Sequence, residues 1–461
     1  MKIIKFHAEN VHGYLPLDVD FHEDLTFLTG LNGSGKTSAL RLIMALLTPN
    51  IEELGVITFS IAYVKIREGE HVLEVSAKKN LDGITLNITS LDDQLHINSS
   101  ELELFMEGRR REETRSLILE KTQQHPVYQK IRSVTTPMFL GLDRRFFSPT
   151  SANDEANDRK REYLLRRYWN DDQALRIGNV HALAEVNYLV VNSLQEVRAS
   201  QEQLDEKLRE EFFARAFEYK PADIFGLPGG VPSREALEGY RRQLTRIEQV
   251  ADSLKIPVPE IQTLLTHFFD RMNGVVKALE RSSETASKKR NSKIKAPTLD
   301  KDFMEWIINK PQADRIFEHL KLLDDYIEKR TALRDPITRF LSLLNTFLKQ
   351  TNKKVTVESK GQLEVSMPSS EIPRSIAALS SGERQLLVML AHLSLNPSLA
   401  ESGVFIVDEP ELSLHMDWQE KFVDAVREAN PKVQLILATH SPAIILDRIE
   451  ACKSLSEVPN D

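Results

Sequence analysis

The eight residues from Gly30 to Thr37 read Gly-Leu-Asn-Gly-Ser-Gly-Lys-Thr, which is the pattern of a phosphate-binding loop. Glycines let the backbone wrap closely around an anion, and the N–H groups at a helix start point toward it. Lys36 would reach the β- and γ-phosphates of a nucleotide, and the Thr37 hydroxyl would hold Mg²⁺. The residues expected to contact the nucleotide are Gly30, Asn32, Gly33, Ser34, Gly35, Lys36, Thr37 and Ser38.

The segments on either side of this loop fit such a site. Residues 24–29 form a short apolar, β-branched run that predicts a strand, and residues 38–47 carry apolar residues at helical spacing. An ordinary glycine-rich turn would not need a strand before it and a helix after it. The sequence therefore predicts a nucleotide site at this loop.

Two adjacent acids, Asp408 and Glu409, close the apolar run that begins at Val404. Asp408 would hold Mg²⁺, directly or through water, and Glu409 would orient and polarise the attacking water, because phosphoryl transfer depends on in-line placement. Residues 433–438 predict another buried strand, and Thr-His-Ser-Pro follows it. A histidine at a strand end can hydrogen-bond the γ-phosphate, so His440 is a second catalytic candidate.

Residues 378–385, Ala-Leu-Ser-Ser-Gly-Glu-Arg-Gln, precede a further apolar helix. A serine and a glycine at a helix N-terminus offer a hydroxyl, backbone N–H groups and a favourable dipole to a γ-phosphate. A plain capped helix, with a serine as the cap and an acid in the first turn, explains the same letters. The nucleotide contacts expected here are Ser380, Ser381, Gly382 and Glu383.

Taken in order, these motifs resemble an ABC-class ATPase of the branch that includes the SMC, Rad50, RecF and OLD proteins. Within this branch the chain is most similar to the stand-alone ATPases of antiphage defence, such as the PtuA ATPase of Septu systems. Ser381 and Glu383 replace a glycine and the glutamine of the class signature, Leu-Ser-Gly-Gly-Gln. His415 stands where transporter-type ATPases carry an aspartate. The motifs lie in residues 1–150 and 335–461.

The resemblance implies an α/β fold, an ABC-type P-loop ATPase core with a mixed sheet flanked by helices and an antiparallel β subdomain. Residues 1–150 would form the N-terminal half of the ATPase domain, residues 151–334 a large all-helical insertion, and residues 335–461 the C-terminal half. The implied ligands are ATP and Mg²⁺. The family's glutamine loop is not assigned, and its candidates are Gln94, Gln123, Gln124 and Gln129.

The resemblance also implies partners. The signature of one subunit completes the phosphate loop of another, which requires at least a head-to-tail dimer with two sandwiched ATPs. The first functional hypothesis is an ATPase that assembles with and controls a separate effector nuclease of the HNH type in antiphage defence. The alternatives are a RecF- or Rad50-like DNA repair ATPase and, against the evidence of His415, a transporter-energising subunit. Since the sequence ends soon after His440, without the TOPRIM nuclease of OLD proteins, we expect another polypeptide to carry the output.

Hydrophobic periodicity predicts the remaining elements. Strands are expected at residues 2–6, 15–21, 56–66, 71–77 and 83–88, the last three as an antiparallel meander, and a buried strand is expected at 137–142. Residues 100–132 are expected to be helical. Apolar stripes in the insertion predict packed helices that prolines keep separate, too short for a long coiled-coil arm. After Pro336, a helix is expected at residues 337–348.

Composition limits the classes of protein to consider. The chain has 461 residues, 41% hydrophobic and 28% charged, which is typical of globular domains. No apolar run approaches the roughly 20 residues that cross a bilayer, and a single cysteine, Cys452, fits the cytoplasm. The net charge of −8 leaves nucleic-acid binding to a local basic patch, for which residues 288–295 are the candidate and a solvated loop the alternative. Arg144 and Arg145 could touch phosphate or form structural ion pairs.

Overall fold

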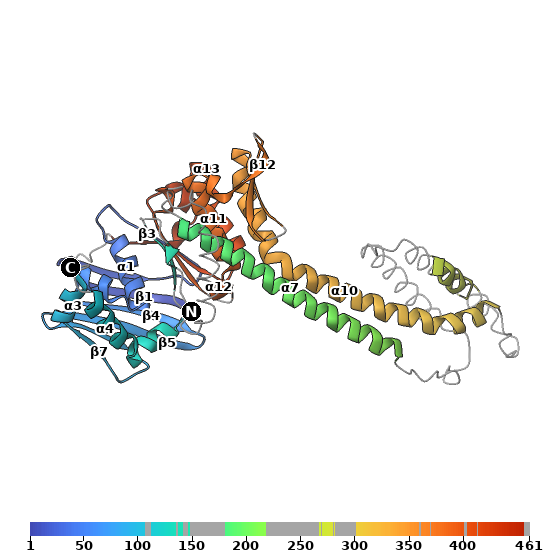
Figure 1. Cartoon of the computed structure of the whole chain (residues 1–461), viewed down its shortest axis with the longest axis horizontal. Coiled ribbons are helices and arrows are strands. Elements are labelled where there is room, and N and C mark those ends of the chain that lie inside the picture. The colour runs from blue at the N-terminus through green and yellow to red at the C-terminus, as the bar shows by residue number, and fades with distance from the viewer. Residues whose placement is uncertain are drawn as a thin grey trace. The chain divides into compact units, whose positions relative to one another are not determined.

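The computed structural model describes residues 1–106, 112–134, 137–141, 146–147, 180–217, 267–268, 270–279, 281, 301–358, 361–368, 370–400, 403–412 and 414–455 (Figure 1). The chain divides into two compact units, one of residues 1–194 and 336–461 and the other of residues 195–335. The first unit contains all the motifs of the expected nucleotide site. The candidate basic loop at residues 288–295, and Arg144 and Arg145, lie outside the described residues.

An antiparallel sheet carries the N-terminal strands in the order β2-β1-β4-β5-β6-β7. Its strands are β1 (Lys2–Val11), β2 (Leu15–Asp20), β4 (Ile61–Glu68), β5 (His71–Asn80), β6 (Gly83–Ile88) and β7 (Leu95–Asn98). The expected strand at residues 56–66 begins later than predicted, because α2 (Ile51–Val56) occupies its start. Asn50 caps this short helix by accepting a hydrogen bond from the Glu53 N–H.

The second sheet has the order β15-β3-β14-β13-β8-β9 within the described residues. Its strands are β3 (Leu25–Thr29), β8 (Met138–Leu140), β9 (Phe146–Phe147), β13 (Val404–Asp408), β14 (Gln434–Ala438) and β15 (Cys452–Ser454). All pairs are parallel except β8 with β9, so the sheet is mixed. One sheet therefore contains strands from both ends of the sequence, with β3 between β14 and β15. The predicted α/β class with a mixed sheet and an antiparallel subdomain is confirmed.

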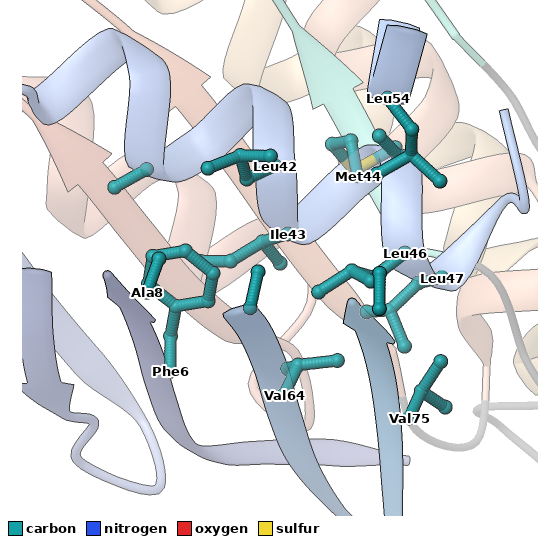
Figure 2. Packing of buried hydrophobic residues seen from close by; sticks show 14 of the residues in the cluster. Phe6, Ala8, Leu42, Ile43, Met44, Leu46, Leu47, Leu54, Val64 and Val75 are labelled. Atoms are coloured by element: carbon teal, nitrogen blue, oxygen red, sulfur yellow. The ribbon is translucent and has the colours of Figure 1, made fainter. Parts of the chain in front are cut away.

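Helix α1 (Lys36–Leu47) follows the phosphate loop and lies against both sheets. Figure 2 shows Ile43 of this helix facing Phe6 of β1, with Leu46 and Leu47 toward Val64 and Val75. The same cluster contains Ile406 of β13 and Ile436 of β14 on the parallel sheet, together with Ala39, Leu40 and Leu42 of the helix. Because apolar residues surround α1 on nearly every side, it is a core helix and not a surface one.

A buried glutamine joins the two sheets by hydrogen bonds. Gln434, at the start of β14, accepts a bond from the Ile3 N–H at 2.7 Å. Its amide donates to the Ile3 carbonyl at 2.8 Å and to the His22 carbonyl at 2.7 Å. Both ends of the side chain are satisfied, so burial of this polar group carries no large penalty.

The first unit also contains seven further helices among its described residues. They are α3 (Ser99–Met106), α4 (Glu112–Gln123), α5 (Pro126–Ser133), α11 (Ser381–Leu395), α12 (Pro397–Ala400), α13 (Met416–Ala429) and α14 (Pro442–Ile445). Short 3₁₀ turns are η2 (Lys349–Thr351), η3 (Ile376–Ala378), η4 (Pro410–Leu412) and η5 (Ile449–Ala451), and a small antiparallel sheet holds β10 (Lys354–Val357), β11 (Leu363–Met367) and β12 (Ser370–Ser375). The expected helical stretch at residues 100–132 is several helices, since His125 and Pro126 begin a new one.

The second unit contains parts of two long helices, α7 (Val180–Phe217) and α10 (Lys301–Leu348), which lie side by side (Figure 1). They run antiparallel, because Asp205 accepts a hydrogen bond from Tyr326 while Phe212, further along α7, packs against His319 at 4.2 Å between ring centroids. The expectation that prolines divide the insertion into separate helices without a long paired arm is therefore wrong for this pair. The prolines that motivated it, at positions 221, 228, 232, 257 and 259, lie outside the described residues.

Helix α10 also continues through Pro336, where a new helix was expected to begin. A proline removes one N–H donor from the helix but does not have to end it. Phe340 and Leu344, beyond the proline, are completely buried in the first unit, and this packing stabilises the last turns. Within the described residues, no helix is long and apolar enough to cross a membrane.

Candidate nucleotide site

The motifs meet at one edge of the parallel sheet. Residue 28 of β3 lies beside Ala438 of β14, and Ala438 lies beside Asp408 of β13. These strands run in the same direction, so the segments that follow them leave from the same edge. The phosphate loop follows β3, Glu409 follows β13, and Thr439 and His440 follow β14.

The phosphate loop has the backbone that an anion cradle requires. Gly30, Gly33 and Gly35 have φ angles of 143°, 85° and 91°, a region that favours glycine. Gly35 is the N-cap of α1, and the first N–H groups of a helix have no partners within it. The loop and the helix start therefore present N–H donors and a positive dipole end to the sheet edge.

Lys36 is held inside the loop that precedes it. Its ammonium group donates hydrogen bonds to the Gly30 carbonyl at 3.0 Å and the Leu31 carbonyl at 3.2 Å, and the side chain is buried. Burial lowers the pKa of Lys36, while the nearby carboxylates of Glu409, Asp408 and Glu411 act in the opposite direction. Lys36 therefore lies among the acids at the ends of β13 and η4.

Asp408 is the buried acid of this group. Burial raises its pKa to about 6, with Glu409 and Glu411 adding to the increase and Thr37 and Lys36 opposing it. Among the described residues, neither carboxylate oxygen has a hydrogen-bond partner of ordinary geometry, although the Thr37 hydroxyl is near enough to lower the pKa. A buried carboxylate without partners is costly unless a cation satisfies it.

This pair of oxygen donors fits Mg²⁺. Mg²⁺ prefers oxygen ligands and is usually held by one or two carboxylates together with substrate phosphates and water. Asp408 and Thr37 offer one carboxylate and one hydroxyl beside the phosphate loop. No group of three or more His, Cys, Asp or Glu side chains placed to hold a metal ion exists in the described part of the chain.

Glu409 has an uncommon backbone conformation. Its φ is 48°, in the left-handed region that residues with a Cβ seldom adopt. The strain is held by two hydrogen bonds, from the Glu409 N–H to the Ala438 carbonyl at 2.8 Å and from the Leu412 N–H to the Glu409 carbonyl at 3.2 Å. Such strain concentrates at functional sites, and here it turns the chain immediately after the last strand residue.

The signature segment forms a capped helix start. Ser380 is the N-cap of α11, and Glu383 completes a capping box with it. Ser380 and Ser381 are exposed, but Glu383 is buried and also accepts hydrogen bonds from Lys353 at 2.7 Å and Thr351 at 2.8 Å. Burial would raise the pKa of Glu383, yet the bonds from Lys353, Ser380 and Thr351 outweigh it and lower the pKa.

The structure thus brings together some of the expected site residues and separates others. Lys36, Thr37, Asp408 and Glu409 lie together, whereas no hydrogen bond or ion pair between described residues joins Ser380 to the phosphate loop. The carboxylate of Glu383 is used within the chain, which fits the capped-helix interpretation of the segment. His415 caps α13 and lies 3.6 Å from Asp417. The glutamine-loop candidates Gln94, Gln123, Gln124 and Gln129 are all exposed, and none is singled out.

One residue of this site was not predicted from the sequence. Glu411 lies near Lys36 and Asp408, and its carboxylate accepts hydrogen bonds from the Thr439 hydroxyl at 2.9 Å and the His440 N–H at 2.7 Å. The available signal was a third acid so close to Asp408 and Glu409 in the sequence. Acids that follow a buried strand tend to share its functional edge.

A family model matches the C-terminal part of the chain. Residues 272–447 match the AAA_21 family, described as "AAA domain, putative AbiEii toxin, Type IV TA system". The match includes the segments of Ser380, Asp408 and His440 and does not reach the phosphate loop, which the parallel sheet brings to the same edge. Over these residues the chain is therefore similar to an ATPase family.

Two curated proteins that are similar to part of this chain carry retron names. They are the "Retron Vc95 probable ATPase" of Vibrio cholerae serotype O1 biovar El Tor, 27% identical over 128 residues, and the "Retron Ec83 probable ATPase" of Escherichia coli, 25% identical over 145 residues. The alignments cover 26% and 27% of this chain. The chain spans only about a quarter of each relative, 23% and 26%.

Solved structures that are similar to this chain include Smc head domains. The Pyrococcus furiosus Smc head with an extended coiled coil, bound to the C-terminal domain of ScpA, is 12% identical, with 96% of this chain and 91% of that chain covered and a TM-score of 0.38. The SMC head of Thermotoga maritima is 11% identical, with 98% and 93% covered and a TM-score of 0.34. These TM-scores are too low to support a conclusion, and the fold follows from the strand order above.

The glycines of the loop provide a test of its geometry. Gly33 and Gly35 both have left-handed φ angles, but a Cβ on Gly35 would lie 2.5 Å from Leu15 Cδ2 and 3.0 Å from Leu17 Cδ2, whereas a Cβ on Gly33 meets nothing within 4 Å. We expect Gly33→Ala to lower the free energy of unfolding by about 1–2 kcal/mol through backbone strain alone. Gly35→Ala should cost roughly 1–3 kcal/mol more, because both leucines must move. Denaturant unfolding without nucleotide measures the difference, and equal losses would contradict the close approach of the β1–β2 hairpin.

Proposed function

We propose that this chain is a Mg²⁺-dependent ATPase that assembles with a separate effector nuclease of the HNH type and controls it in antiphage defence. The observation that carries the ATPase part is the single sheet edge at which the phosphate loop, Asp408 and Glu409 meet. A cation, a buried acid and a half-buried acid, all beside a helix N-terminus, are the parts that phosphoryl transfer needs. Family resemblance and the retron names of the relatives support the defence part.

Each residue has a chemical role in this proposal. The loop N–H groups and Lys36 bind the β- and γ-phosphates and stabilise the negative charge that the transferred phosphoryl group carries. Thr37 and Asp408 would hold Mg²⁺, which neutralises phosphate charge when bound. Glu409 accepts a hydrogen bond from the attacking water and places it in line, and His440 hydrogen-bonds the γ-phosphate.

A second copy of the chain would complete the site. Ser380 and Ser381 are exposed at the N-terminus of α11, a position suited to a γ-phosphate, yet within the described residues they make no hydrogen bond to the phosphate loop. In a head-to-tail dimer the α11 start of one subunit can close the loop of the other. Two identical composite sites result, each with residues from both subunits.

The chemistry is tested by replacing the acid that positions water. We expect Glu409→Gln to bind ATP and Mg²⁺ as the wild type does and to lose turnover by about 100-fold or more, since one positioning group is removed. Equilibrium nucleotide binding and phosphate release measure the two properties separately. Lys36→Ala is the matched variant that should weaken nucleotide binding itself. Near-normal hydrolysis by Glu409→Gln would place the water-activating group elsewhere.

The composite site is tested by mixing two inactive subunits. Ser380→Arg places a long cation at the α11 start and should abolish hydrolysis while leaving ATP binding to its own loop intact. In a heterodimer with Lys36→Ala, one composite site carries both defects and the other carries none. We therefore expect phosphate release to return in the mixture if each site can act alone.

Size-exclusion chromatography of differently tagged subunits provides the control that the two chains exchange. Exchanged heterodimers without activity would show that hydrolysis needs two intact sites. Full activity of Ser380→Arg by itself would contradict completion of the site by a second subunit.

The effector is tested in cells together with the gene that neighbours this one. If that gene encodes an HNH nuclease, we expect the pair to reduce phage plaque formation and the two proteins to purify together. Glu409→Gln should change protection, because control of the effector depends on the nucleotide state. Protection against DNA damage with no effect on phage would contradict the defence role and favour a repair ATPase.

A further inference from the structure

Glu411 is an acid of the nucleotide site whose oxygens are already engaged. It lies in η4, immediately beyond the turn that Glu409 makes, and one oxygen accepts the Thr439 hydroxyl at 2.9 Å while the other accepts the His440 N–H at 2.7 Å. The Thr439 oxygen in turn accepts the Ser441 N–H at 3.0 Å. A single carboxylate therefore joins the segment after β13 to the segment after β14.

A second side chain strengthens this connection. Gln419 of α13 accepts a hydrogen bond from the Ser441 hydroxyl at 2.6 Å. Its amide donates to the Leu414 carbonyl at 2.9 Å and to the Glu411 carbonyl at 3.4 Å. The segment Thr439–Ser441 is thus attached at three consecutive residues to the chain between Glu411 and Gln419.

The imidazole of His440 has no comparable support. The side chain is exposed, and within the described residues it makes no hydrogen bond or ion pair. Glu411 contacts the backbone N–H of His440 and not its imidazole. The position of the imidazole therefore depends on where the backbone is held. Glu411 provides that hold, because its carboxylate accepts the His440 N–H at 2.7 Å.

We propose that Glu411 is a positioning residue that fixes His440 at the γ-phosphate site and aligns it with Glu409. The inference rests on the proposed function and adds a residue to it. Glu411 is distinct from Glu409 in its use, because each of its oxygens already accepts a hydrogen bond, from Thr439 or His440, which makes it the weaker proton acceptor. Glu411 acts through the segment Thr439–Ser441 and not on the substrate.

Three variants separate positioning from charge. Glu411→Ala removes both acceptors, and we expect kcat to fall roughly 10- to 100-fold, as misplacement of a catalytic group does, with little change in KM or ATP affinity. Glu411→Gln keeps one acceptor for the His440 N–H, and its amide can donate to the Thr439 oxygen, so it should retain most of kcat. Glu420→Ala, which removes an exposed acid from α13, is the matched control and should behave as the wild type. Equal losses in the Ala and Gln variants would show that the charge matters and overturn the positioning role.

A double-mutant cycle identifies the residue through which Glu411 acts. If Glu411 works by placing His440, Glu411→Ala should cost little further kcat in a chain that already carries His440→Ala. Losses that multiply in the double variant would overturn the inference. If Glu411→Ala does not fold, Thr439→Val removes one of the two donors and permits the same cycle.

Hydrogen exchange at the His440 amide provides a readout that does not depend on catalysis. In the folded, nucleotide-free protein, we expect this amide to exchange faster in Glu411→Ala than in the wild type, and at nearly the wild-type rate in Glu411→Gln. Unchanged exchange in Glu411→Ala would show that Glu411 does not hold the segment. A wild-type chain without ATPase activity would refute the proposed function, whereas active wild type with unaffected Glu411→Ala would refute this inference alone.

Discussion

Burial of α1 between two sheets is the constraint on which the nucleotide site depends. Leu40, Leu42, Ile43 and Leu46 are fully buried, and each such side chain contributes about 1.5–3 kcal/mol when removed from water. The antiparallel sheet covers one side of the helix, and β13 and β14 cover the other. The N-terminus of α1 is thereby fixed at the sheet edge where the phosphate loop meets Asp408, Glu409 and the segment Thr439–Ser441. A surface helix could offer the same dipole but would not hold it in register with Asp408.

The charges at this edge explain why a phosphate ligand and a metal ion would bind together. Asp408, Glu409 and Glu411 surround a single buried cation, Lys36, so the acids are in excess. The pKa of about 6 at Asp408 is the consequence of burial beside like charges, and a divalent cation would favour its ionised form. A nucleotide without a cation would add negative charge to acids that already repel one another. These charges would therefore suit the metal–nucleotide complex that the proposed function requires.

Short motifs made much of this site predictable. The phosphate loop, Asp408 and Glu409 lie at ends of buried parallel strands, and each is defined by neighbours in sequence that determine the local backbone. Glu411 escaped prediction because its partners, Thr439 and His440, are 28 and 29 positions away. The partners of Glu383, Thr351 and Lys353, are similarly remote. The prediction of a helix start after Pro336 was wrong for a different reason. Burial of Phe340 and Leu344 outweighs the local preference of proline to end a helix.

The bonds of Gln434 have a consequence for how the polypeptide is synthesised. Gln434 contacts Ile3, which is 431 positions away, and β3 in the N-terminal region pairs with β14 and β15 from the C-terminal region. While the ribosome is still making the insertion, β3 has neither parallel partner, and one side of α1 lacks its cover. Such long-range pairing slows folding and leaves apolar strands open to aggregation. Synthesis of the second unit, residues 195–335, lengthens the interval during which these surfaces are uncovered.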